Sequence, residues 1–273
     1  MRFGVNTFLW TATFTDRNFD LLPTILDHGF DGIEVSLFHP QEFLATKIRH
    51  ALSEYGLGCT VCSVLPNGMS LICDDSDIRR KARSHMSDCV QVTAEAGADL
   101  IAGPLYAPVG YLPGRRRTQD EWKRAIDAYQ ELGPVLEKNG IHLCIEPLNR
   151  FETYFLNTTA DAIRLCEEVS HPNVGILWDT FHANIEEKDL KQALLSTGRH
   201  LKHVHTCEND RVLPAAAMLI GRACLQLSDN FNMTDGSRSR ASGLLLASSL
   251  LRPPSGEIWR KLRKTSLGKE SSS

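Results

Sequence analysis

A helix that ends at a glycine and leads at once into a buried strand recurs along the first three quarters of this chain. The phrases HGFDGIEV, YGLGCTV, AGADLIA and KNGIHLCIE each contain it, with the glycine where a left-handed helix cap favours that residue. Its repetition at the spacing of βα units predicts a parallel sheet. Seven such units before residue 212 predict an α/β fold of the (β/α)₈ TIM barrel type, whose active site lies at the carboxyl ends of the strands.

Apolar runs and helical periodicity give the expected boundaries of these units. The strands are expected at residues 2–6, 31–36, 58–64, 99–105, 142–148, 174–180 and 201–207. The helices are expected near residues 19–28, 41–55, 77–96, 119–139, 159–169 and 187–196. A doubly wound sheet is the alternative, and it is disfavoured because no phosphate-binding glycine fingerprint occurs at the first strand-to-helix turn.

The composition of the chain changes after residue 211. Residues 1–211 hold 21 Lys and Arg against 29 Asp and Glu, whereas residues 212–273 hold 9 against 4 and are rich in Ser and Leu. The βα rhythm stops where an eighth unit is due. We therefore expect residues 1–211 to form a barrel of seven βα units and residues 212–273 to be an atypical tail. The eighth unit would then be absent or disrupted, leaving the first and seventh strands as unpaired edges.

The totals exclude several classes of protein. A formal net charge of −3 favours neither nucleic acid nor a membrane surface as a partner, and no apolar run reaches the roughly 18 residues of a membrane span. No signal-peptide pattern precedes the first strand, so a cytoplasmic location is expected. We expect the eight cysteines to be reduced thiols in the core. Cys59-x-x-Cys62 has no matching second pair, as a zinc site would need.

Three apolar runs end in a side chain that can bind a metal. They lie in HLCIEP, where the apolar run ends at Glu146, in VGILWDT, where it ends at Asp179, and in LKHVHTC, which contains His205. Burying a carboxylate or imidazole at such a position costs several kcal/mol of desolvation free energy unless an opposite charge or a metal ion compensates it. Two carboxylates and one imidazole suit Mn²⁺, Mg²⁺ or Co²⁺ better than a structural zinc site, which favours thiolates.

Further polar residues follow the same strand ends. Glu152, His182 and Arg211 fall on loops at the expected active-site end and can face a polar substrate. The run Arg115-Arg116-Arg117 follows Pro113-Gly114 and has two interpretations, a phosphate site or a solvated run of charges.

The segments CIEPLNRFETY, GILWDTFHANIEE and LKHVHTCENDR resemble the ketose 3-epimerase branch of the xylose isomerase-like barrel superfamily, which contains D-tagatose and D-psicose 3-epimerases. The resemblance covers about residues 1–211. It implies an isomerase with metal ligands Glu146, Asp179 and His205, Mn²⁺ first among the cations, and substrate-binding roles for Glu152, His182 and Arg211. It also implies a ketose substrate and a homodimer or tetramer.

The reaction that the resemblance implies is proton exchange at C3 of a ketose through an enediolate. One Glu removes the proton from one face and a second Glu returns it to the other, and Glu146 matches one of the two. The second, which is also the fourth metal ligand, belongs on the eighth strand. After Arg211 the only carboxylates are Asp229, Asp235, Glu257 and Glu270, and none ends a strand-like run.

We interpret residues 212–273 as read out of frame after loss of one base near codon 211, with a divergent or disordered basic tail as the alternative. In a neighbouring frame, the codons of VLPAAAMLIG permit Gly-Thr-Pro-Gly-Ser-Gly-His-Ala-Asp-Trp. Those of DGSRSRAS permit Gly-Trp-Leu-Ala-Ile-Glu-Gly-Phe, with the Glu codon spanning Ser239 and Arg240. The chain as written should then be impaired in catalysis.

Other functions remain open on the sequence alone. Hydroxypyruvate isomerase, inosose dehydratase and sugar-phosphate isomerases of the same superfamily would share the metal set and differ in their substrate loops. A non-catalytic remnant of such a barrel is the alternative from a different class. An endonuclease would need a basic groove, and the excess of acidic residues in 1–211 argues against one.

Overall fold

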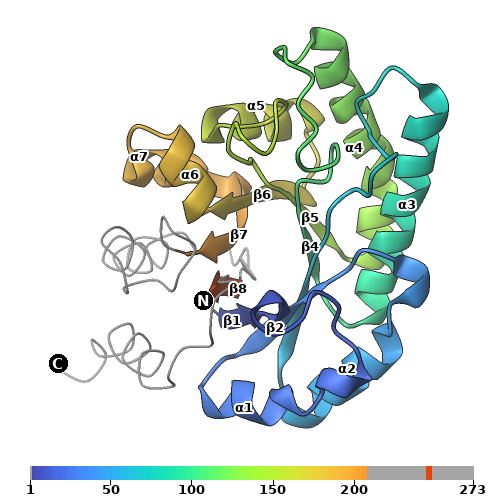
Figure 1. Ribbon diagram of the computed structural model, residues 1–273, viewed down its shortest axis with the longest axis vertical. Coiled ribbons are helices and arrows are strands. Elements are labelled where there is room, and N and C mark those ends of the chain that lie inside the picture. The colour runs from blue at the N-terminus through green and yellow to red at the C-terminus, as the bar shows by residue number, and fades with distance from the viewer. Residues whose placement is uncertain (1, 208–243, 248–273) are drawn as a thin grey trace.

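The protein folds as a closed barrel of eight parallel strands (Figure 1). The computed structural model describes residues 2–207 and 244–247. The strands follow one another around the barrel in chain order. They are β1 (Arg2–Asn6), β2 (Gly32–Ser36), β3 (Gly58–Cys62), β4 (Leu100–Gly103), β5 (His142–Ile145), β6 (Val174–Asp179), β7 (Leu201–Thr206) and β8 (Leu244–Ala247).

Helices connect the strands from β1 to β7 and lie outside the barrel (Figure 1). They are α1 (Leu21–Asp27), α2 (Ala45–Tyr55), α3 (Ser76–Glu95), α4 (Gln119–Asn139), α5 (Thr159–Val169), α6 (Thr180–Glu186) and α7 (Leu190–Ser196). Short 3₁₀ helices η1 (Thr7–Leu9), η2 (Asp16–Asn18), η3 (Pro40–Glu42) and η4 (Gly198–His200) complete the connections. The predicted barrel is confirmed, and α6 is an addition that the apolar pattern did not predict.

The eighth position of the barrel is occupied by a short strand. β8 pairs in parallel with β1 through Arg2 and Leu244, and with β7 through Val204 and Leu245. The expectation that β1 and β7 would be unpaired edges is therefore wrong. The sequence LLLA of β8 contains no carboxylate, so the missing acidic ligand is not restored there. The rest of the proposed out-of-frame tail lies outside the described residues.

Three of the described strands are buried on both faces, as the continuous apolar runs predicted. Every residue of β2, β4 and β6 is buried. Two of the predicted glycine caps end their helices in the left-handed region, Gly56 after α2 and Gly140 after α4, each with φ of 65°. The repeated phrase therefore does set where each helix stops and the next strand begins.

One glycine is required next to the site. Gly103 ends β4 with φ of 140°, and a Cβ atom added there would collide with the backbone oxygen of Ser63. Its carbonyl accepts a hydrogen bond from the backbone N–H of Glu146, over 3.1 Å. The close approach of the backbones at Gly103 and Ser63 thus fixes the start of the loop that carries Glu146.

None of the helices in the described ranges combines the length and the apolarity that a membrane span requires.

Candidate active site

Two carboxylates and an imidazole meet at the carboxyl ends of β5 and β6. Ligand atoms of Glu146, Asp179 and His182 all lie within 4.8 Å of one another, and all three residues are buried. Glu146 directly follows β5, Asp179 is the last residue of β6, and His182 lies in the first turn of α6. The site therefore forms where a TIM barrel is expected to place it.

His205 reaches this cluster from the neighbouring strand β7. Asp179 and His205 are register partners, and the Nδ1 atom of His205 lies 3.6 Å from Oδ2 of Asp179. The other oxygen of Asp179 caps α6, because Oδ1 accepts a hydrogen bond of 2.7 Å from the backbone N–H of Phe181. That bond fixes the carboxylate so that its second oxygen faces His205.

The two carboxylates differ in their pKa values. Burial, with the nearby charges of Asp179 and Glu34, raises the pKa of Glu146 to about 8. Burial also opposes ionisation of Asp179, but the imidazoles of His205 and His182 lower its pKa. Of the two buried carboxyl groups, Asp179 is therefore the one that ionises more readily.

The hydrogen bonds around His182 indicate that its Nε2 atom is a hydrogen-bond donor. Asn149 directs its backbone N–H and its side-chain amide at Nδ1 of His182, over 3.2 and 2.9 Å. Because Nδ1 then accepts, the neutral ring carries its proton on Nε2, which lies 3.6 Å from Oε1 of Glu146. An imidazole that presents N–H to the site is suited to bind a substrate oxygen. The substrate-binding role of His182 stays a prediction.

The loop after β5 carries Glu152, which is predicted to bind the substrate. Hydrogen bonds and an ion pair hold this loop in place. The side-chain amide of Asn149 donates to Oε1 of Glu152 over 3.0 Å, and the Glu152 carbonyl accepts from the backbone of Gly110 over 2.7 Å. Arg150 forms a two-pronged ion pair with Glu186 on α6, over 3.0 and 2.8 Å. These contacts fix the loop against α6, next to Glu146.

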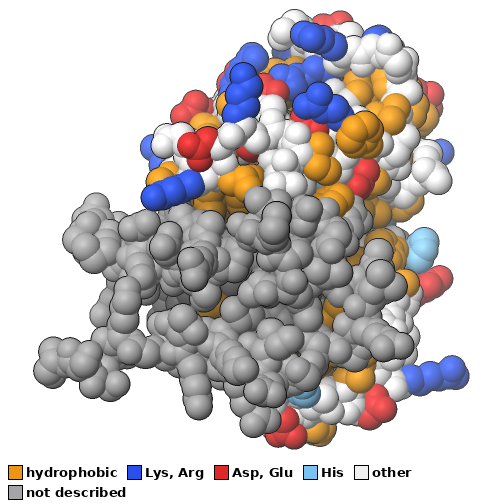
Figure 2. Space-filling model, turned by 60° about the vertical axis from the view of Figure 1, so that its left-hand side comes forward, with side chains coloured by type: hydrophobic (Ala, Val, Ile, Leu, Met, Phe, Trp, Pro, Cys, Tyr) orange, Lys and Arg blue, Asp and Glu red, His pale blue; other side chains and the backbone are white. Residues whose placement is uncertain are grey.

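The three consecutive arginines are not gathered into a phosphate site. Arg115 forms a two-pronged ion pair with Glu121, over 3.0 and 2.7 Å. Arg117 does the same with Asp161 over 2.9 and 2.7 Å, and its guanidinium lies 4.6 Å from the ring centroid of Trp122. Two of the three therefore serve the structure of the loop. Acidic and basic side chains also lie intermixed over the described part of the face in Figure 2.

Of the predicted site residues, Arg211 lies outside the described residues. Glu146, Asp179, His182 and His205 come together at one end of the barrel, and Glu152 follows on the adjoining loop.

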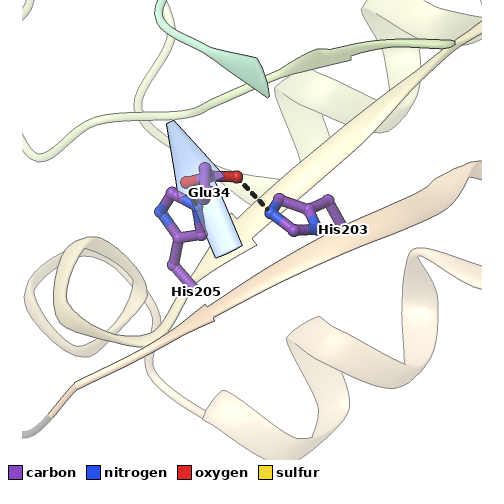
Figure 3. Close-up of side chains that lie close together, drawn as sticks. All are labelled: Glu34, His203 and His205. Carbon is purple, nitrogen blue, oxygen red and sulfur yellow. Dashed lines mark hydrogen bonds and ion pairs between the residues drawn. The ribbon is translucent and has the colours of Figure 1, made fainter. Parts of the chain in front are cut away.

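Sequence reasoning missed a second group of polar side chains inside the barrel. Glu34 on β2 lies between the imidazoles of His203 and His205 on β7 (Figure 3). Its Oε2 atom lies 2.8 Å from Nε2 of His203, and its Oε1 atom lies 2.9 Å from Nε2 of His205. Two signals were present. Glu34 interrupts a buried apolar run, and His203 and His205 alternate at the spacing that points both to one face.

The residues present fit a divalent cation. Glu146 and Asp179 are each only 7% exposed, and in the described part of the chain their salt bridges are made with imidazoles alone. Among the described residues no Lys or Arg pairs with either group, so ionising both Glu146 and Asp179 would leave negative charge uncompensated. Oxygen donors of this kind with one imidazole suit Mn²⁺, Mg²⁺ or Co²⁺.

Comparison with known proteins agrees with this geometry. The sequence pattern of the xylose isomerase-like TIM barrel family matches residues 22–236. A protein of Synechocystis sp. described as a probable ketose 3-epimerase is 34% identical over 216 residues, which cover 79% of this chain and 75% of that protein. A D-psicose 3-epimerase of Ruminiclostridium cellulolyticum is 31% identical over 212 residues, covering 74% and 72% of the two chains.

Solved structures share the fold. A D-allulose 3-epimerase from Methylomonas sp., crystallised with D-allulose, superposes with a TM-score of 0.82 at 22% identity, over 91% of this chain and 84% of that one. The chain therefore belongs to the xylose isomerase-like TIM barrel family, in the lineage of its ketose 3-epimerases.

Proposed function

We propose that this chain is a metal-dependent ketose 3-epimerase whose acid–base machinery is incomplete as the sequence is written. The observation that carries the proposal is the meeting of Glu146 and Asp179, both buried, with His182 and His205 at the carboxyl end of the barrel. The ketose 3-epimerase relatives support the reaction class. Glu146, Asp179 and His205 would hold the metal, with Mn²⁺ first among the candidates.

A cation bound there would polarise the C2 carbonyl of a ketose and so make the hydrogen at C3 more acidic. Glu146 would then accept that proton, while the C3–H electron pair forms the C2–C3 double bond and the π pair of the carbonyl moves to its oxygen, giving an enediolate. The Nε2–H group of His182 and the carboxylate of Glu152 bind hydroxyl groups of the sugar, and Arg211 is proposed to join them. Protonation of C3 on the opposite face completes the inversion.

The group that would deliver this second proton is missing. The residues that the structure describes include no carboxylate on β8, and none of the four carboxylates after Arg211 ends a strand-like run in the sequence. Losing one general acid–base group costs about 10²- to 10⁴-fold in rate. We therefore propose that the chain as written inverts C3 very slowly or not at all, and that residues 212–273 are read out of frame.

Two other functions remain as alternatives. Relatives of the same superfamily that isomerise hydroxypyruvate or sugar phosphates, or dehydrate inosose, would use the same metal set. The ion pairs of Arg115 and Arg117 give no support to a phosphorylated substrate. A barrel that binds a metal and turns nothing over is the second alternative.

The direct experiment is to sequence the gene over codons 200–270 and to assay two chains. One is the chain as written, and the other has the lost base restored. Incubation of each with D-psicose and Mn²⁺, followed by chromatography of the sugars, should give the C3 epimer only with the restored chain. Stop codons in both neighbouring frames would rule out the frame interpretation. Normal turnover by the chain as written would rule out the impairment.

A further inference from the structure

The carboxylate of Glu34 lies inside the barrel, below the proposed metal site, and is fully buried. We propose that Glu34 is a positioning residue for the metal centre, which holds the imidazole of His205 so that its Nδ1 atom faces the same point as Asp179. This inference rests on the proposed function, because it assigns a role toward the metal of that site.

The first argument is the number of donors aimed at this carboxylate. On Oε1, Asn6 donates from Nδ2 over 3.0 Å and His205 forms an ion pair over 2.9 Å. On Oε2, Thr60 donates from its hydroxyl over 3.1 Å and His203 lies 2.8 Å away through Nε2. Both oxygens must therefore accept. Only an ionised carboxylate meets that need, because the amide of Gln would place N–H groups against one of these pairs of donors.

The second argument is where these donors come from. Asn6, Glu34 and Thr60 are register partners on the adjacent strands β1, β2 and β3. The two histidines come from β7, which is not a neighbour of β2 in the barrel. Glu34 thus reaches across the interior and joins one wall of the barrel to the strand that carries a proposed metal ligand (Figure 3).

The third argument is the orientation of the His205 ring. Its Nε2 atom lies 2.9 Å from Oε1 of Glu34, in an ion pair that does not have hydrogen-bond geometry, and its Nδ1 atom lies 3.6 Å from Oδ2 of Asp179. An ion pair at one nitrogen turns the other nitrogen of the ring toward Asp179. Metal-binding histidines usually have such a partner on the second nitrogen, and its removal typically costs about 10- to 100-fold in metal affinity. His203 restrains the other oxygen of Glu34 and so helps to keep the carboxylate in place.

An alternative is that Glu34, His203 and His205 themselves bind a second cation, since their ligand atoms lie within 4.8 Å of one another. The 2.8 Å separation of Glu34 and His203 is the distance of a direct charge-assisted hydrogen bond. The two interpretations differ in stoichiometry, with one Mn²⁺ per chain if Glu34 positions His205 and two if it binds a metal.

The test is Mn²⁺ titration of the full chain followed by electron paramagnetic resonance, which counts free Mn²⁺ and needs no turnover. The parent chain should bind one Mn²⁺. Glu34→Gln should bind one Mn²⁺ about 10- to 100-fold more weakly. Glu121→Gln is the matched control, since Glu121 is also buried and accepts several hydrogen bonds but touches no proposed ligand, and its affinity should not change.

A milder pair of variants keeps the test valid if Glu34→Gln does not fold. Thr60→Val removes one donor to Glu34, whereas Thr93→Val removes the buried hydroxyl that bonds the Cys89 carbonyl on α3. Only Thr60→Val should weaken Mn²⁺ binding.

Equal affinities of the parent, Glu34→Gln and Thr60→Val chains for Mn²⁺ would overturn the positioning role while leaving the proposed function intact. Two Mn²⁺ ions in the parent and one in Glu34→Gln would replace it with a second metal site. A parent chain that binds no Mn²⁺ would overturn the proposed function itself.

Discussion

The Oδ2 atom of Asp179 lies 3.6 Å from the Nδ1 atom of His205, across two strands whose residues are register partners. The same carboxylate caps α6 through its other oxygen. The strand end, the helix start and the candidate metal site therefore depend on one side chain, and its two oxygens can be tested separately.

Asp179→Asn should weaken Mn²⁺ binding by at least about 100-fold. That loss is larger than the usual effect of removing a residue that only hydrogen-bonds to a metal ligand. The amide keeps an oxygen to accept the Phe181 N–H group, so the cap of α6 should survive. Asp189→Asn is the matched control, because Asp189 caps α7 through Gln192 and lies outside the site. Titration with Mn²⁺ measures both. Equal affinities of the two variants would show that Asp179 is not a ligand.

His182→Gln separates the two possible roles of that imidazole. Because Nδ1 accepts from Asn149, we expect a donor to substrate and not a metal ligand. Mn²⁺ affinity should stay within about 3-fold of the parent, whereas Glu146→Gln should lose about 10-fold or more. In the chain with the frame restored, His182→Gln should raise the KM for the ketose. A loss of Mn²⁺ affinity as large as that of Glu146→Gln would make His182 a ligand.

Gly103→Ala should destabilise the barrel and disturb the loop of Glu146. The added Cβ would meet the Ser63 backbone oxygen, in a backbone conformation that L side chains rarely adopt. We expect a loss of more than about 2 kcal/mol in the free energy of unfolding, measured with urea. Gly110→Ala controls for the backbone effect, since Gly110 also has positive φ, of 84°, but nothing within 4 Å of its Cβ position. It should lose only about 1 kcal/mol. Equal losses would refute the contact with Ser63.

Glu121 should make the fold sensitive to acid. Burial opposes its ionisation, but hydrogen bonds from Arg115 and the Thr118 backbone lower its pKa to about 2. A carboxyl group whose pKa is depressed in the folded state contributes stability above its unfolded value near 4.5, and that stability is lost as the pH falls toward 2. Arg115 is nearly half exposed, so after screening we expect about 1–2 kcal/mol.

Urea unfolding between pH 7 and pH 3 checks this acid dependence. Glu121→Gln should lose stability at pH 7 and show a flatter pH profile than the parent. Asp127→Asn removes an exposed pair with Lys123 and should leave the profile unchanged. Identical profiles for the parent and Glu121→Gln would contradict the role of this ion pair.

Most of the barrel followed from the sequence because its strands are continuous apolar runs with glycine at the preceding helix ends. β7 was expected at 201–207 and spans Leu201–Thr206. α6 was missed because it begins directly at the end of β6, with Asp179 serving as both strand end and helix cap. An apolar run that passes straight from strand to helix gives no break that a periodicity argument can detect.

The candidate site was predicted in part. Glu146, Asp179 and His205 each end or nearly end a strand, so their meeting followed from barrel topology. Glu34 lies in the middle of β2, and its partner His203 on β7 is 169 residues away. Nothing local in the sequence reveals that contact. The pairing of β8 with β1 and β7 was missed for a similar reason, since LLLA sits in a segment whose composition differs from that of the barrel.

The most direct test of the central claim is hydrogen exchange at C3 in the chain as written. With Glu146 as the remaining base, the chain should remove and return a proton on one face only. Ketose pairs that differ at C3 are incubated with Mn²⁺ in D₂O, and proton NMR follows the C3 signal. We predict that one member of a pair exchanges its C3 hydrogen for deuterium without inversion, and that Glu146→Gln abolishes the exchange. If no ketose exchanges at C3 while Mn²⁺ is bound, this chain is a metal-binding barrel without epimerase chemistry.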